Sequence, residues 1–358
     1  MDLFSPYMLG DLRLSNRIVM APMTRCRAIG ENIPGPLSVL YYSQRASAGL
    51  IITEGSQVSP RGVGYSRTPG IYSAGQVAGW KPVTDAVHAA GGKIFLQLWH
   101  VGRMSHPDFL GGELPVGPSA LPVDDEIHTP RGKKRVPVPR ELETEEIAGI
   151  VESFRKGAAN AKKAGFDGVE IHGANGYLLD QFLRDGSNHR NDQYGGSLEN
   201  RMRFPLEVTA AVAGEWKESR IGYRISPHFL AHGMSDSDPR ETFSRFAHRL
   251  SEEGIGYVHL IEPVGGRLGA VDPAMRMLPR IREEFAGTLI LNGGYDAHSG
   301  SAAIAGGSAD MVSYGAPFLA NPDLPERFRR NAPLNDPDPS RFYTGEEKGY
   351  TDYPALGG

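Results

Sequence analysis

The sequence has very little cysteine, because Cys26 is the single one among 358 residues. One cysteine excludes an intramolecular disulfide framework and a zinc site built from several cysteines, and we expect no metal site. No apolar run approaches the length of a membrane helix, and the N-terminal residues lack the hydrophobic segment of a signal peptide. The net charge is −4 without a basic stripe, which argues against a nucleic-acid surface. We therefore expect a soluble, cytoplasmic protein that binds neither membranes nor nucleic acid.

Three sequence signatures are also absent. No internal repeat with a period of about 20–50 residues is visible, which excludes a solenoid. The glycine fingerprint of Rossmann domains and the GxxxxGK[ST] phosphate-binding loop do not occur. A nicotinamide cofactor would therefore have to bind without a Rossmann domain.

The sequence does contain eight short apolar segments that alternate with helical stretches, without a shift in composition along the chain. Near-continuous apolar runs are typical of parallel strands that are covered on both faces. The segments predicted as strands are 17–22, 49–55, 92–100, 169–171, 220–226, 256–262, 287–294 and 309–315. This alternation predicts an α/β fold, a single (β/α)8 TIM-barrel domain that spans residues 1–358.

Helical composition and stop signals predict the segments between these strands. The predicted helices are 37–47, 76–90, 144–164, 199–214, 239–253 and 273–285. Thr144 is the predicted N-cap of the third of these helices, and Gly165 ends it.

Three further segments extend the predicted barrel. Residues 1–16 read as a hairpin that caps the bottom of the barrel, with a turn at Gly10-Asp11. Residues 101–141 form a long irregular excursion after the third strand, with seven prolines, and loops of this length are usually lids or binding loops. Residues 331–358 form a C-terminal tail.

The stretch around the fourth strand carries the most informative residues. The strand 169–171 runs into His172, Asn175 and Tyr177, and barrel enzymes present polar groups at the carboxyl ends of their strands. Two hydrogen-bond donors that converge on one oxygen, beside a phenolic proton, suit a substrate that becomes an enolate. The alternative is a core histidine, a turn asparagine and a packed tyrosine.

Other strand ends carry residues that could contact a ligand. Thr24 follows the first strand, where it could also cap a turn, and Gln97 ends the third. Arg224 lies within the fifth strand, and a buried arginine should meet an anion, either a carboxylate of this chain or a ligand. Strands seven and eight both end in glycine before a helical turn, which could bind a phosphate or could be a plain tight turn.

These strand ends belong to longer motifs. The motifs are Asn16-Arg-Ile-Val-Met-Ala-Pro-Met-Thr-Arg25, Tyr42-Ser-Gln-Arg-Ala-Ser-Ala-Gly49, Gln97-Leu-Trp-His-Val-Gly-Arg103, Val169-Glu-Ile-His-Gly-Ala-Asn-Gly-Tyr-Leu179, Asp192-Gln-Tyr-Gly-Gly-Ser-Leu-Glu-Asn-Arg201, Asn321-Pro-Asp-Leu324 and Gly349-Tyr-Thr-Asp-Tyr-Pro354. Together they resemble the old yellow enzyme family of FMN-dependent ene-reductases, over residues 3–354. The resemblance is strongest to its bacterial branch of pentaerythritol tetranitrate, N-ethylmaleimide and morphinone reductases.

The resemblance implies a role for each matching position. It implies that FMN contacts Pro22, Met23, Thr24, Gly55, Gln97, Arg224, Gly293, Gly294, Gly315 and Ala316. It implies that His172 and Asn175 bind the substrate oxygen, that Tyr177 gives the proton, and that Trp99, Tyr65 and Tyr343 shape the substrate pocket.

The sequence departs from the family pattern at two positions. Many relatives carry a phosphate-binding arginine where this chain has Ala316, so the resemblance implies that backbone amides or a basic residue elsewhere hold the phosphate. Asn175 replaces the second histidine of the bacterial relatives but matches the His/Asn pair of the yeast branch. Cys26 lies two residues beyond the position where another branch has a cysteine, and it receives no flavin-tuning role.

The implied activity is reduction of activated C=C bonds in α,β-unsaturated ketones, aldehydes, imides and nitroalkenes, with nitrate esters as further candidates. NAD(P)H would be the hydride donor, with NADPH favoured, and small electron-poor alkenes would be the substrates. The protein would be a monomer or a weak homodimer.

Two other functional classes remain open. One is a cofactor-free barrel lyase or aldolase that binds a substrate phosphate, although no strand ends in a Schiff-base lysine. The other is a flavin-binding sensor without turnover.

Overall fold

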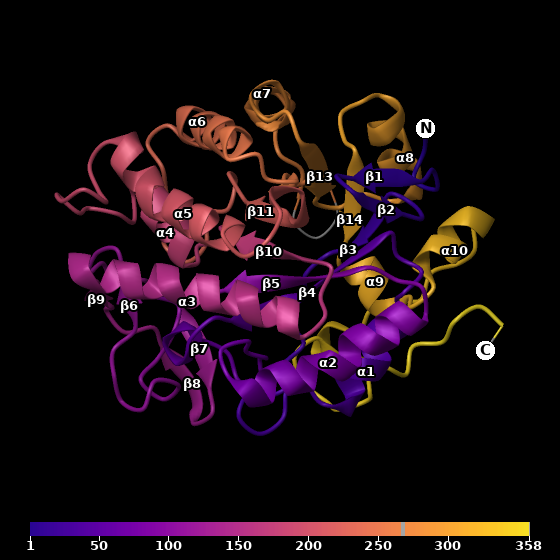
Figure 1. The fold of residues 1–358 in the computed structure, drawn as a ribbon, viewed down its shortest axis with the longest axis horizontal. Coiled ribbons are helices and arrows are strands. Elements are labelled where there is room, and N and C mark those ends of the chain that lie inside the picture. The colour runs from indigo at the N-terminus through magenta and orange to yellow at the C-terminus, as the bar shows by residue number, and fades with distance from the viewer. Residues whose placement is uncertain (266–268, 358) are drawn as a thin grey trace.

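A closed barrel of eight parallel strands forms the centre of the molecule in a computed structural model that describes residues 1–265 and 269–357 (Figure 1). The strands follow one another around the barrel in chain order, and the last strand, β14, closes it against the first, β3. This confirms the predicted (β/α)8 fold. The barrel strands are β3 (Ile18–Met20), β4 (Leu50–Gln57), β5 (Ile94–Trp99), β10 (Gly168–His172), β11 (Ile221–Ile225), β12 (Tyr257–Ile261), β13 (Thr288–Asn292) and β14 (Met311–Tyr314).

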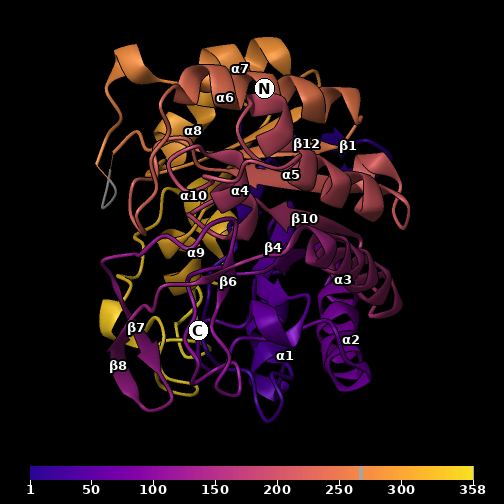
Figure 2. The same ribbon diagram turned by 90° about the vertical axis from the view of Figure 1, so that its left-hand side faces the viewer.

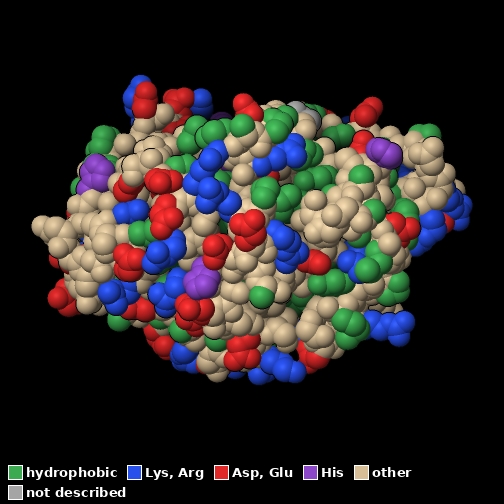
Figure 3. Space-filling view, turned by 90° about the horizontal axis from the view of Figure 1, so that it is seen from above, with side chains coloured by type: hydrophobic (Ala, Val, Ile, Leu, Met, Phe, Trp, Pro, Cys, Tyr) green, Lys and Arg blue, Asp and Glu red, His purple; other side chains and the backbone are tan. Residues whose placement is uncertain are grey.

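Helices surround the barrel and bury the outward side chains of its strands in one large apolar core. The helices are α1 (Pro36–Ser43), α2 (Ala74–Ala89), α3 (Thr144–Lys163), α4 (Leu178–Leu183), α5 (Leu198–Ala213), α6 (Pro239–Glu252), α7 (Leu278–Glu284), α8 (Ala297–Ala305), α9 (Ala316–Ala320) and α10 (Leu324–Arg330). None of the described helices is both long and apolar enough to cross a membrane. Acidic and basic side chains are interspersed on the face shown in Figure 3.

The N-terminal hairpin closes the bottom of the barrel. Its strands β1 (Tyr7–Leu9) and β2 (Leu12–Leu14) pair antiparallel, and their leucines pack on inward side chains from β3, β4, β5 and three later strands. Two of these inward side chains are large rings, Phe95 and Tyr257, which need empty space on the neighbouring strands. A Cβ atom at Gly168 would lie 2.4 Å from the Phe95 ring, and one at Gly222 would lie 1.9 Å from the Tyr257 ring.

The excursion after β5 is more regular than its proline content suggests. It contains β6 (Val116–Gly117) and an antiparallel hairpin of β7 (Glu126–Thr129) and β8 (Gly132–Arg135), and β6 pairs with β9 (Arg140–Glu141). The sequence description of residues 101–141 as irregular is therefore wrong for these short strands. Figure 2 shows the β7–β8 hairpin on the same side as the C-terminal segment.

Two local predictions also need correction. Glu143, and not Thr144, is the N-cap of α3: the Glu143 N–H donates to Glu146, while the Thr144 hydroxyl donates to Asp192 at 2.6 Å. The short helix α4 was missed, because its six residues are all buried and so carry no amphipathic pattern.

Candidate active site

An inner cavity of about 380 Å³ opens at the carboxyl ends of the barrel strands. It collects the predicted site residues Pro22, Met23, Thr24, Gly55, Gln97, Trp99, His172, Asn175, Tyr177, Arg224, Gly315, Ala316 and Tyr343. The cavity also includes Leu319 and Phe342, which the sequence analysis missed. Both were difficult to find, because neither belongs to a strand end.

His172 presents a single hydrogen-bond donor to the inner cavity. It is the last residue of β10 and is buried, and this burial holds the pKa of its ring well below the usual value. Its Nδ1 accepts the N–H of Ala174 at 3.3 Å. Because a neutral imidazole with one accepting nitrogen carries its proton on the other, Nε2 is the donor.

Asn175 lies beside His172 with an unusual backbone conformation. Its φ of +58° is left-handed, which asparagine tolerates better than most residues. The Asn175 N–H donates to the hydroxyl of Ser226 at 2.7 Å, and its carbonyl lies 3.2 Å from His232 Nδ1. These contacts fix the Asn175 backbone at the inner cavity, which Asn175 lines.

Tyr177 completes the group as a protonated phenol. Burial raises the pKa of Tyr177 well above its ordinary value, so the hydroxyl keeps its proton at neutral pH. Its hydroxyl lies 2.9 Å from that of Tyr65. The Tyr177 ring also stands edge-on to Trp99 and His172, with both pairs of ring centroids 5.1 Å apart.

An outer cavity of about 720 Å³ adjoins the inner one and shares Thr24, Tyr177 and Tyr343 with it. Tyr65 lies in this outer cavity and not in the inner one. Cys26 also lines it, and burial raises the pKa of the thiol to about 12, so the sulfur is not a thiolate at neutral pH. The two cavities therefore meet at these three shared residues.

A network of polar side chains lies inside the barrel below the inner cavity. Glu170 accepts a hydrogen bond from Gln97 Nε2 at 2.8 Å and lies 2.9 Å from His259 Nδ1, and His259 Nε2 lies 2.7 Å from the Ser313 hydroxyl. The sequence analysis missed Glu170 and His259. The signal was available, because both are ionisable residues in the middle of apolar strands, as Arg224 is.

Arg224 lies at the edge of this network and has an unsatisfied atom. Its Nη2 donates to Asn292 Oδ1 at 3.2 Å, and its Nε is buried without a partner among the described residues. Burial lowers the pKa of Arg224, and Glu170 nearby raises it. The sequence predicted that Arg224 meets either a carboxylate of this chain or an anionic ligand. Glu170 lies near Arg224, but the two form no direct ion pair among the described residues. An acceptor on a ligand therefore remains as the partner of Arg224 Nε.

Two predicted glycines lie outside the inner cavity. Gly293 and Gly294 have φ of +131° and +83°, and a Cβ atom there would lie 2.6 Å from Pro263 and 2.2 Å from Gly265. Glycine is therefore required at both positions by the neighbouring backbone. Gly315, in contrast, lines the cavity and has ordinary space for a Cβ atom, 3.6 Å from Met23.

The wall over the cavity comes from the C-terminal tail. Arg25 Nε donates to the Phe342 carbonyl at 3.1 Å, and Arg27 Nη1 donates to the same carbonyl at 3.0 Å. Arg27 also donates to the Arg341 carbonyl at 2.9 Å. These buried arginines hold Phe342 and Tyr343 at the cavity.

Comparison with known proteins agrees with this architecture. The model of the NADH:flavin oxidoreductase / NADH oxidase family matches residues 2–335. The chain is 48% identical to 12-oxophytodienoate reductase 1 of Oryza sativa subsp. japonica, over 99% of this chain and 93% of that protein.

Solved structures extend the similarity to the whole fold. Morphinone reductase in complex with tetrahydroNAD is 48% identical, with a TM-score of 0.94 over 99% of this chain and 98% of that one. The old yellow enzyme homologue of Zymomonas mobilis is 45% identical, with a TM-score of 0.96 over 99% of each chain. The chain therefore belongs to the NADH:flavin oxidoreductase / NADH oxidase family, as an FMN-dependent oxidoreductase of the old yellow enzyme type.

Proposed function

We propose that the protein reduces the activated C=C bond of α,β-unsaturated ketones, aldehydes, imides and nitroalkenes, with nitrate esters as further substrates. The observation that carries this proposal is the shared position of His172, Asn175 and Tyr177 in one cavity with Arg224. His172 and Asn175 can each donate a hydrogen bond to the same oxygen. Tyr177 can supply a proton, and Arg224 supplies a cation.

The residues of the inner cavity fit FMN. Gln97 and Arg224 would face the pyrimidine edge of the flavin, where the orphaned Arg224 Nε would find an acceptor. Pro22, Met23 and Thr24 would lie beside the ring, and Gly315 and Ala316 near the phosphate. When bound, FMN would supply to the β-carbon of the alkene a hydride taken from NAD(P)H.

The phosphate would be held mainly by backbone amides. Among the described residues that line the inner cavity, Arg224 is the only cation, and Ala316 provides none. The backbone turns at Gly293, Gly294 and Gly315 would therefore bind the phosphate through N–H groups, as at other glycine-rich turns.

His172 Nε2 and the Asn175 amide would hold the activating oxygen of the substrate. Negative charge develops on that oxygen during reduction of an enone, and a donor fixed beforehand stabilises it by roughly 2.7–4 kcal/mol. The neutral state of His172 suits this role, because it donates without giving up its proton.

Tyr177 would donate a proton to the α-carbon. Its raised pKa keeps the phenol protonated in the resting site. Tyr65, whose hydroxyl lies 2.9 Å away, would orient the Tyr177 hydroxyl and border the wider outer cavity, where larger substrates extend. For the hydride donor we propose NADPH, a preference that rests on the family resemblance.

An absorption spectrum tests the proposal. The purified protein should show the visible bands of oxidised flavin, lose them under anaerobic NADPH, and regain them when 2-cyclohexenone is added. A flavoprotein that bleaches with NADPH but is not reoxidised by any electron-poor alkene would overturn ene-reduction. A protein that takes up no added FMN would overturn the flavin site itself.

A further inference from the structure

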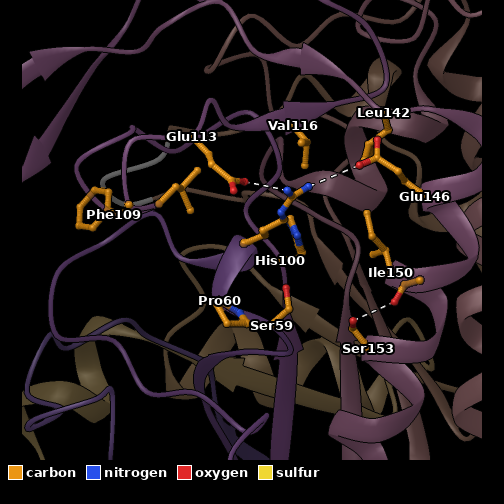
Figure 4. A pocket seen from close by; sticks show the side chains of 14 residues that line it. Ser59, Pro60, His100, Phe109, Glu113, Val116, Leu142, Glu146, Ile150 and Ser153 are labelled. Carbon is orange, nitrogen blue, oxygen red and sulfur yellow. Dashed lines mark hydrogen bonds and ion pairs between the residues drawn. The ribbon is translucent and has the colours of Figure 1, made fainter.

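A third cavity lies beside His100, the residue directly after β5, and has no part in the proposed reaction. This lateral cavity has a volume of about 690 Å³ and is bordered by η1 (Pro60–Gly62), the 101–141 excursion and α3. Figure 4 shows His100 in the middle of the labelled side chains, between Val116 and Ser59. Trp99 lines the inner cavity and the next residue, His100, lines the lateral one.

His100 offers one unused hydrogen-bond donor to this cavity. The side chain is 2% exposed, and its Nδ1 accepts the N–H of Gly102 at 3.1 Å. Burial, with a smaller effect of Arg61, lowers the pKa of His100 to about 3, so the ring is neutral and its proton lies on Nε2. In the part of the chain that the structure describes, the one side-chain hydrogen bond of His100 is the bond that Nδ1 accepts from Gly102, which leaves Nε2 available to a ligand. Because His100 lines the cavity, an acceptor on a bound molecule can take the hydrogen bond that Nε2 offers.

The walls of the lateral cavity define the rest of the ligand. Aliphatic and aromatic side chains make up much of the lining: Phe109, Leu110, Val116, Leu142 and Ile150. Both carboxylates of the lining are paired: Arg61 lies 2.7 Å from Glu113 and 3.5 Å from Glu146, and Arg140, which lies outside the lining, is 2.6 Å from Glu146. Two cations facing two carboxylates leave no net charge for an ionic ligand.

We propose that the lateral cavity is a binding site for an uncharged, mainly apolar carbonyl compound, whose oxygen accepts a hydrogen bond from His100 Nε2. The carbonyl supplies an acceptor and no donor, which matches a ring nitrogen that can only donate. The apolar body of the compound lies along Val116, Leu142 and Ile150. This site is separate from the inner cavity, and the inference holds whether or not the inner cavity reduces alkenes.

The saturated ketone 2-octanone is a suitable probe, because it has no C=C bond to be reduced. The experiment uses the oxidised holoenzyme with labelled Ile, Leu and Val methyl groups, and records nuclear Overhauser contacts from the ketone. Contacts to Ile150, Leu142 and Val116 methyl groups are expected. Contacts confined to Leu319 in the inner cavity, or no contacts at all, would overturn the proposal.

Variants separate the hydrogen bond from the shape of the cavity. H100F removes the donor and should weaken 2-octanone binding at the lateral site about tenfold, whereas H100Q, which keeps an N–H, should bind more tightly than H100F. I150W fills the cavity and should abolish the contacts to Leu142. K156W places the same indole on the exposed side of α3 and should leave them intact. Unchanged binding in both H100F and I150W would show that the ketone does not occupy this site.

Discussion

The side chains that point into the barrel form two layers of different character. The bottom layer is apolar, whereas the upper layer, two residues further along the same strands, is polar. Side chains alternate across a strand, so every second residue points into the barrel. In β12 the inward residue changes from Tyr257 to His259, and in β13 from Ile290 to Asn292. β14 changes in the same way from Met311 to Ser313.

This difference separates a layer that stabilises the fold from a layer that prepares the site. The bottom layer packs on the leucines of the hairpin and has no hydrogen bonds to satisfy in its side chains apart from the Tyr257 hydroxyl, which is buried without a partner among the described residues. The upper layer contains ionisable groups that hold one another in place and leave Arg224 Nε without a partner among the described residues. Substitutions in the upper layer should therefore change cofactor binding or chemistry, in some cases together with stability, whereas those in the lower layer should change stability alone.

The largest expected effect is on catalysis, at the top of the site. Tyr177→Phe removes the proton donor but keeps the ring that packs on Trp99 and His172, so the free energy of unfolding should hardly change. The rate of reoxidation by 2-cyclohexenone should fall by about 10²- to 10⁴-fold, as for loss of a general acid. Stopped-flow absorbance measures this step apart from flavin reduction by NADPH, which should stay the same. An equal loss in both half-reactions would contradict the role of Tyr177.

A large effect on both stability and cofactor binding is expected at Glu170, in the polar upper layer. Glu170→Leu leaves Gln97 and His259 without their shared acceptor, and each buried donor left unpaired typically costs about 1–3 kcal/mol. Urea unfolding of the apoprotein measures the loss, and flavin fluorescence measures the weaker binding of FMN. Glu170→Gln keeps an acceptor for Gln97 and should lose less. A Leu variant as stable as the wild type would show that the network contributes little.

The bottom layer provides the matched comparison. Leu9→Ala removes a fully buried side chain of the hairpin plug and should lower the free energy of unfolding by about 2–5 kcal/mol. FMN affinity and both half-reactions should remain at wild-type values, because no residue of the plug lines the inner cavity. Denaturant unfolding and flavin titration, performed on the same preparation, check both statements. Loss of flavin affinity in this variant would mean that the two layers are coupled.

The sequence was sufficient to predict the barrel, because eight apolar segments separated by helices leave few other arrangements. It also placed most of the site residues at strand ends, where carboxyl termini of parallel strands must meet. It did not reveal the β7–β8 hairpin, because exposed and charged residues such as Lys133 hide the pattern of a two-stranded sheet. Phe342 was also hidden, since only the long-range contacts of Arg25 and Arg27 bring it to the cavity.

The smallest expected effect is a pH dependence from Glu54, which lies in β4 directly before Gly55 of the inner cavity. Burial raises the pKa of Glu54 to about 7, although the carboxylate accepts the Arg25 N–H at 3.0 Å. The folded state therefore holds a proton that the unfolded chain releases near pH 4.5, so this contribution to stability is complete below that pH and is lost as the pH rises through about 7.

Glu54→Gln removes this titration and provides the measurement. The free energy of unfolding in urea should fall less between pH 5 and pH 8 for Glu54→Gln than for the wild type, with a difference of at most about 3 kcal/mol, because each unit of pKa shift corresponds to 1.36 kcal/mol. Equal slopes in the two proteins would show that Glu54 is ionised in the folded state throughout this range. In that case the favourable effect of Arg25 and Arg27 on the Glu54 carboxylate would outweigh the effect of burial on its pKa. Glu54 would then add no pH dependence to stability between pH 5 and pH 8, like the apolar side chains of the bottom layer.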